Sequence, residues 1–130
     1  MFKFSGARPS NLGVKDGKLA ACPGNPNCVN SQAGGGKHGI GALAFSGDAA
    51  AAMQKLAGIV AALPGAQVIE GKADYLRVEF STALMGFVDD VEFYCDGKAI
   101  QVRSASRLGY SDFGVNRKRI EAIRSAFSDR

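Results

Sequence analysis

Residues 75–106 read "YLRVEFSTALMGFVDDVEFYCDGKAIQVRSAS", and this stretch decides the fold. Apolar and polar residues alternate in three consecutive runs, at 75–80, 87–95 and 99–104. Alternation with a period of two is typical of β-strands that bury one face. The pair Asp96-Gly97 between the second and third runs is a strong hairpin signal. The stretch therefore predicts three antiparallel strands joined by short turns.

The segments on either side extend this sheet and cover it. Residues 67–70 and 40–45 predict two further short strands, the latter at the start of the fold. Residues 49–63 place apolar side chains at helical spacing, and a second apolar stripe predicts a helix near the C-terminus. We therefore expect an α+β fold in the order β-α-β-β-β-β-α. It has an antiparallel sheet of about five strands, with two helices on one face.

Composition indicates one soluble domain. A chain of 130 residues matches the usual domain size. Residues 1–39 contain eight of the 17 glycines and three of the four prolines, which predicts an irregular N-terminal arm packed on a single α+β domain at 40–130. No apolar run approaches the roughly 18–20 residues of a membrane span. The N-terminus lacks an apolar secretory segment, so we expect a cytoplasmic location, while export stays open.

Positive charge is concentrated at the C-terminal end. The net charge is +4, and residues 101–130 carry seven Lys and Arg against three Asp and Glu. This excess is small beside that of nucleic-acid-binding proteins, and the aromatic residues are not interleaved with the cations. We therefore expect no nucleic-acid partner and interpret these cations as solvated or paired.

The predicted sheet has a second, polar face. Asp90 and Glu92 point to that face from one strand, and Arg103 does so from the next. Most of this face is expected to be a solvated ladder of charges. Two carboxylates could also bind Mg²⁺ or Ca²⁺, but neighbouring arginines favour ion pairs. The sequence predicts no metal site and no cofactor.

The segment "RSASRLGYSDFGVNRKR", residues 103–119, gathers five cations around a turn. Ser111 or Asp112 can cap the helix that follows, and a helix N-terminus beside arginines suits a phosphate, sulfate or carboxylate. The acid that these arginines need is either such a ligand or a carboxylate of the protein, namely Asp89, Asp90 or Asp112. The candidate ligand-binding residues are Asp90, Glu92, Arg103, Arg107, Asp112, Asn116 and Arg117.

The three cysteines divide into a pair and a single residue. Cys22 and Cys28 enclose a loop with two prolines, which fits a disulfide, half of a metal site or two free thiols. The restricted loop predicts that their Cα atoms lie within about 7 Å of one another. Cys95 should be buried in a strand, and His38 is expected on the surface.

Three blocks of the sequence occur together, "CPGNPNCVNSQA", "FVDDVEF" and "RSASRLGYSDFGVNRKRIEAI". With these blocks the chain resembles the domain of unknown function 1499 family, a group of small bacterial and plastid-associated proteins without an established activity. The resemblance extends from Arg8 to Ile123. It implies that the blocks belong to one fold, and it suggests export of some members, where the cysteine pair could oxidise. It implies no reaction.

Three functions follow as hypotheses. The first is a non-catalytic binding module for a small anionic or polar ligand. The alternative is a structural or protein-interaction domain in which an arginine–carboxylate network fastens the C-terminal helix. A hydrolase that works through the acidic pair or Cys28 has the least support, because no nucleophile, base and orienting group come together in the sequence.

Overall fold

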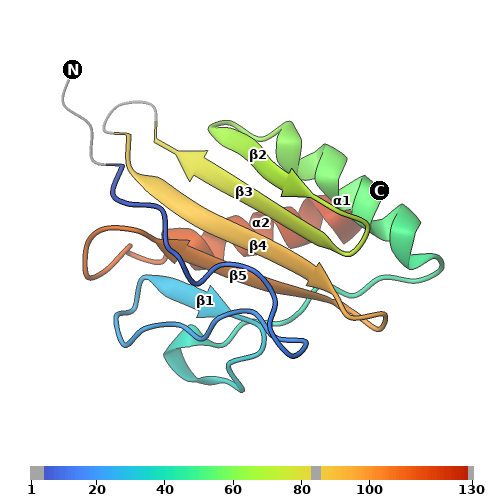
Figure 1. The fold of residues 1–130 in the computed structure, drawn as a ribbon, viewed down its shortest axis with the longest axis horizontal. Coiled ribbons are helices and arrows are strands. Elements are labelled where there is room, and N and C mark those ends of the chain that lie inside the picture. Colours follow the sequence, from blue (N-terminus) through green and yellow to red (C-terminus); the bar gives the residue numbers. More distant parts are fainter. Residues whose placement is uncertain (1–4, 83–85, 129–130) are drawn as a thin grey trace.

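A computed structural model describes residues 5–82 and 86–128, which form an antiparallel sheet and two α-helices (Figure 1). The five strands lie in the order β1-β5-β4-β3-β2. This confirms the predicted α+β class and the order β-α-β-β-β-β-α. The elements are β1 (Cys28–Asn30), the 3-10 helix η1 (Gly36–His38), α1 (Ala49–Ala61), β2 (Ala66–Gly71), β3 (Tyr75–Ser81), β4 (Val88–Cys95), β5 (Ile100–Ser106) and α2 (Val115–Ser128).

The predicted hairpin joins β4 to β5. The carboxylate of Asp96 accepts hydrogen bonds from the backbone N–H groups of Lys98 and Ala99, both at 2.9 Å. Gly97 has a φ of 93°, a left-handed conformation that glycine adopts without a steric penalty. Side-chain capping and glycine therefore set the tight turn that the Asp-Gly pair predicted.

Both helices cover one face of the sheet, behind it in Figure 1. Leu56 of α1 and Ile120 of α2 are fully buried against the inward-facing residues of the strands. Asp48 caps α1 by accepting a hydrogen bond from Ala51 N at 2.9 Å. The apolar core thus lies between the sheet and the helices, as the alternation of the strands requires.

The first strand is not where the sequence predicted it. Residues 40–45 contribute only an isolated bridge, in which Leu43 exchanges two backbone hydrogen bonds with Ile100. The edge of β5 is instead occupied by β1, which pairs with it antiparallel so that Cys28 faces Ala105. Because β1 fills that edge, the 40–45 segment passes the end of the sheet without forming a strand.

The other face of the sheet is covered by residues 5–23, which we call the covering segment. Figure 1 shows this segment in blue, crossing in front of β4 and β5. Arg8 Nε reaches Glu79 at 2.6 Å, and Gly13 N donates to Glu92 at 2.7 Å. Asp90 is 1% exposed and Glu92 is not exposed at all. The prediction of a solvated charge ladder is therefore wrong, because the chain's own N-terminal part excludes water from these charges.

Candidate functional site

Arg107 holds two carboxylates beneath the covering segment. Its Nε and Nη2 atoms donate to the two oxygens of Asp90 at 2.8 and 2.9 Å. Nη2 also donates to Glu79 at 2.7 Å, and Arg8 binds the same Glu79 oxygen. We call these four residues the Arg107 clamp. It fastens β3, β4, the end of β5 and the covering segment to one another.

The charges of the clamp balance and stabilise each other. The hydrogen bond to Asp90 is the main cause that raises the pKa of Arg107, against the opposing effect of burial. Burial alone would raise the pKa of Glu79, but hydrogen bonds and charges from Arg8 and Arg107 outweigh it and lower that pKa. Two cations therefore neutralise two carboxylates here, and the clamp has no excess charge to offer a ligand.

A second group of charges lies on the same face of the sheet, two residues away from the clamp residues along β3 and β4. Arg77 of β3, Glu92 of β4 and Arg103 of β5 face one another in a row across three strands. Each has one buried polar atom without a hydrogen-bond partner: Arg77 Nη1, Glu92 Oε1 and Arg103 Nε. We call these three residues the open row. Buried polar groups are nearly always hydrogen-bonded, so three unpartnered atoms in one row are unusual.

The remaining contacts of the open row are few. The second oxygen of Glu92 accepts from Tyr75 Oη and Gly13 N. Burial and the contact with Glu92 raise the pKa of Tyr75, so its hydroxyl stays protonated as a donor. Arg103 is 4% exposed, and within the described residues its one hydrogen bond is a long one of 3.4 Å to the carbonyl of Ala21. Arg77 also pairs with Glu70 of β2 at 3.8 Å, so the unused hydrogen-bonding capacity next to an unpaired cation lies at Arg103.

Two cavities border the open row. The larger has a volume of about 410 Å³. Its wall includes Arg103 and is formed by residues of both the sheet and the covering segment. The smaller, about 170 Å³, includes Arg77 and Tyr75. The walls of the larger cavity are formed by Ala7, Pro9, Asn11, Ala21, Cys22, Pro23, Asp90, Arg103, Ala105, Ser106 and Arg107.

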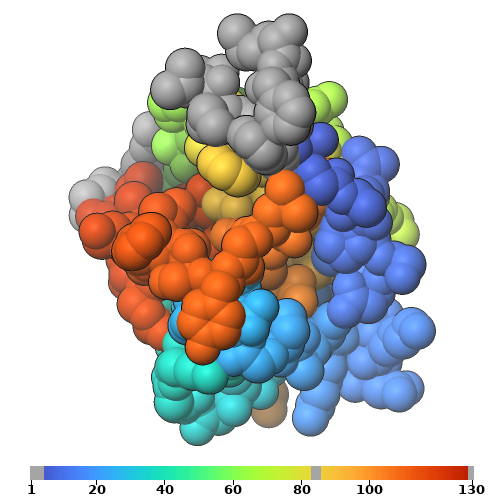
Figure 2. Space-filling model, turned by 90° about the vertical axis from the view of Figure 1, so that its left-hand side faces the viewer, coloured from blue at the N-terminus to red at the C-terminus, as the bar shows by residue number. Residues whose placement is uncertain are grey.

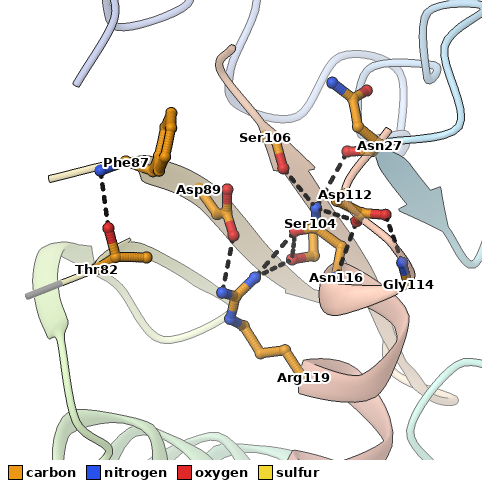
Figure 3. A network of polar contacts seen from close by, with 10 residues as sticks. All are labelled: Asn27, Thr82, Phe87, Asp89, Ser104, Ser106, Asp112, Gly114, Asn116 and Arg119. Atoms are coloured by element: carbon orange, nitrogen blue, oxygen red, sulfur yellow. Dashed lines mark hydrogen bonds and ion pairs between the residues drawn. The ribbon is translucent and has the colours of Figure 1, made fainter. Parts of the chain in front are cut away.

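A separate polar network fixes the start of α2 on the helix side of the sheet (Figure 3). The amide of Asn116 donates to Asn27 O at 3.1 Å, to Ser106 Oγ at 2.9 Å and to Asp112 at 2.7 Å. Its oxygen accepts from Ser104 Oγ. This network joins α2, β5 and the residue that precedes β1.

The N-terminus of α2 already has an anionic partner. The carboxylate of Asp112 accepts from Gly114 N at 2.8 Å and from Asn116 N at 3.0 Å. Burial would raise the pKa of Asp112, but the hydrogen bonds from Asn116 and Gly114 lower it overall. The acid that the sequence placed beside this helix end is therefore the protein's own Asp112.

Arg119 links this network to Asp89 of β4. Arg119 pairs with Asp89 at 2.8 Å and donates to Asn116 Oδ1 at 3.0 Å (Figure 3). Its guanidinium lies 4.8 Å from the centre of the Phe80 ring, which adds a cation–π contact. Asp89 and Asp90 point to opposite faces, as adjacent strand residues must.

The structure divides the predicted ligand-binding residues into separate places. Asp90, Glu92, Arg103 and Arg107 lie together under the covering segment. Asp112 and Asn116 lie on the helix side of β5, because Ser104, their neighbour, alternates with Arg103. Arg117 is at the surface and donates to the carbonyl of Lys37. The seven residues therefore do not line one pocket.

Several residues of these networks were not among the candidates. Arg8, Glu79 and Arg77 complete the polar face, while Asp89 and Arg119 complete the helix-side network. The alternation of β3 placed Arg77 and Glu79 on the correct face, and this signal could have identified them. The sequence around Arg8 does not indicate that it belongs to this network, because its partner Glu79 lies 71 residues further along the chain.

Cys22 and Cys28 form a disulfide with a Cα–Cα distance of 5.7 Å, and Cys95 is a buried free thiol. His38 Nδ1 lies 3.0 Å from the carbonyl of Cys28. Within residues 5–82 and 86–128, no group of three or more His, Cys, Asp or Glu side chains is placed to hold a metal ion. In the same part of the chain, no helix is long and apolar enough to cross a bilayer.

Removing the disulfide should lower the free energy of unfolding. Replacing both Cys22 and Cys28 with serine frees the unfolded loop, and the chain-entropy relation for so short a loop gives a loss of about 2 kcal/mol. Urea unfolding of the wild type and the double variant measures this loss. A reducing agent should destabilise the wild type by the same amount and leave the variant unchanged. An unchanged wild-type midpoint under reduction would contradict the prediction.

Comparisons with known proteins give one match. A family described as "Protein of unknown function (DUF1499)" matches residues 18–127, which include every strand and helix described above except the last residue of α2. No curated protein and no solved structure matches this chain. The match covers most of the chain and contains the residues of the open row, the disulfide and the helix-side network. The chain therefore belongs to the DUF1499 family.

Proposed function

We propose that this protein is a non-catalytic binding module for a small anionic ligand, held between the covering segment and the face formed by β3, β4 and β5. The observation that carries this proposal is the state of Arg103. Its side chain is buried, its Nε has no partner, and no carboxylate among the described residues forms an ion pair with it. A buried cation without a paired anion is costly, and an anionic ligand would remove that cost.

The electrostatics of Arg103 support the same reading. Burial is the main cause that lowers the pKa of Arg103, while the charges of Glu92 and Asp90 partly oppose it. Arg77 has a second carboxylate in Glu70 at 3.8 Å, whereas Arg103 faces Glu92 across the strands without forming an ion pair with it. A carboxylate or phosphate beside Arg103 would place a negative charge in direct contact with this guanidinium and accept its unused N–H group. Arginine is well suited to such oxyanions because its planar fork matches their geometry.

The cavity beside Arg103 has the size and lining of a small-ligand site. Its volume of about 410 Å³ falls within the range of roughly 300–1,000 Å³ typical of ligand pockets. Ala7, Pro9 and Ala105 supply apolar wall, and Asn11 supplies an amide. The ligand class that fits is a small carboxylate or phosphate compound with a partly apolar body.

The clamp has a different role from Arg103 in this proposal. The donors of Arg107 that face the sheet are used by Asp90 and Glu79, so Arg107 positions the wall of the cavity. Glu92 orients the open row through its bonds to Tyr75 and Gly13. Asp112, Asn116 and Arg117 lie outside the cavity and have no part in binding.

A structural role without a ligand is the second candidate. The complete pairing of Arg107 favours it, because that pairing fastens the covering segment without outside help. The two candidates differ at Arg103. If this is a ligand site, the guanidinium of Arg103 contributes to affinity. If the cluster is purely structural, nothing explains why a buried Nε is left without a hydrogen-bond partner.

Calorimetric titration with inorganic phosphate and a panel of small mono- and dicarboxylates tests the proposal. A charged hydrogen bond contributes about 1.5–3 kcal/mol, so Arg103→Gln should weaken binding roughly 10-fold to 100-fold. Arg124→Gln is the matched control, because Arg124 binds Glu121 and the carbonyls of Gly41 and Ala42 on another part of the surface. No binding of any panel member to the folded wild type, or equal loss in both variants, would reject the binding function.

A further inference from the structure

An apolar tip stands at the turn between β5 and α2. Phe113 is 88% exposed and Tyr110 is 67% exposed, with Leu108 and Val115 at 42% and 46%. We call these four residues the apolar tip. Large aromatic side chains exposed side by side on a short turn are unusual for a soluble surface, and such patches commonly mark an interaction site.

The turn holds Phe113 in a strained conformation. Its φ of 54° lies in the left-handed region, where a bulky residue is an outlier. Hydrogen bonds fix the turn there, with Ser111 accepting from Phe113 N and Asp112 accepting from Gly114 N. Packing of the Phe113 ring does not compensate for this strained backbone, since the ring projects into solvent. Strain at an exposed aromatic residue is typical of a functional position.

The surroundings of the apolar tip are cationic. Arg117 donates to the carbonyl of Lys37, which brings these two residues together just behind the tip, and Lys118 follows on the exposed side of α2. None of the three forms an ion pair within the described residues. Asp89 is paired with Arg119, while Asp112 is hydrogen-bonded to neutral groups and keeps one negative charge against these three cations. The rim of the tip therefore keeps a net positive charge, since three cations face one carboxylate.

The shape and charge of the tip favour one kind of partner. Figure 2 shows the segment around residue 110, in orange, standing forward of the cyan N-terminal part of the chain. A second copy of this chain would place the same cations against each other, which opposes a symmetric contact. A projecting apolar turn with a cationic rim instead suits an anionic membrane surface, where Tyr and Phe enter the headgroup boundary and Lys and Arg meet the lipid phosphates.

We propose that the apolar tip docks the protein on the surface of an anionic lipid bilayer. Phe113, Tyr110 and Val115 enter the headgroup region, and Lys37, Arg117 and Lys118 contact the negative headgroups. Arg107 in the wall of the cavity directly precedes Leu108 of the tip, but the docking uses other side chains and does not rest on the proposed ligand binding.

Co-sedimentation with lipid vesicles tests the docking. The full chain should bind phosphatidylcholine vesicles containing phosphatidylglycerol about tenfold more strongly than vesicles of phosphatidylcholine alone, and added salt should reduce the binding. Phe113→Asn should reduce binding about tenfold, since it removes the apolar ring. Asparagine tolerates a positive φ, so this variant should keep the melting temperature of the wild type. Val68→Ser, an exposed apolar residue of β2, is the control and should bind like the wild type.

Three outcomes would overturn the docking. The first is a folded wild type that binds neither vesicle. The second is a loss of binding in Val68→Ser equal to that in Phe113→Asn. The third is a concentration-dependent dimer, seen by light scattering, that Phe113→Asn abolishes while vesicles bind nothing; that result would assign the tip to a second copy instead.

Discussion

Arg107→Ala should lower the free energy of unfolding by about 3–5 kcal/mol, the usual cost of removing one partner from a buried ion pair. The substitution leaves Asp90, whose side chain is 2% exposed, without its two hydrogen bonds from the guanidinium. Glu79 keeps only the partly exposed Arg8. Urea unfolding followed by circular dichroism measures the loss, and the unfolding midpoint should fall with it.

Arg124→Ala provides the comparison for Arg107. Arg124 pairs with Glu121 one helical turn away, and that carboxylate is half exposed. Exposed pairs of this kind contribute up to about 1 kcal/mol, and the hydrogen bonds from Arg124 to the carbonyls of Gly41 and Ala42 add to this. The control should still lose less stability than Arg107→Ala, because it leaves no buried charge unpaired. If Arg107→Ala unfolded at the same urea concentration as Arg124→Ala, the clamp would not fasten the fold.

Asn116→Ala should lower the free energy of unfolding by about 2–4 kcal/mol, because each buried partner left unsatisfied costs about 1–3 kcal/mol. Asn116 is fully buried, and its amide is the partner of Asn27 O, Ser106 and Ser104. Alanine can replace none of these contacts. The same urea experiment measures the effect.

Lys118→Ala is the matched control for Asn116. Lys118 lies two residues further on the same helix and is exposed, so truncating it should change stability by less than about 0.5 kcal/mol. An Asn116→Ala variant as stable as Lys118→Ala would show that the helix-side network does not hold α2 to the sheet.

The sheet and its helices were predictable because their signals are local. Alternation within residues 75–104 assigned each side chain to a face, and an Asp-Gly pair located the hairpin. Alternation also determines that Asp89 and Asp90 serve different networks. These inferences need only the period of a strand and the chemistry of a turn.

The candidate site was harder to predict because its contacts join distant parts of the chain. The local pattern showed that Arg103 and Asn116 are close in sequence, but α2 folds back to the opposite side of β5, so the sheet separates them. The burial of the polar face depends on Arg8 and Gly13, whose partners lie more than seventy residues away. A strand of three residues, β1, is too short to give a periodic signal.

The covering segment and β1 also determine when different parts of the chain can fold during synthesis. Both precede the strands that they contact, and β1 has its only strand partner in β5, near the other end of the described fold. The Cys22–Cys28 loop is the exception, since its two thiols leave the ribosome almost together and need no distant partner. Until β3 and β4 have emerged, the covering segment lacks its partners Glu79 and Glu92, and β1 has no strand to pair with until β5 follows. The residues that are translated before the rest of the fold are therefore the ones whose positions are fixed last.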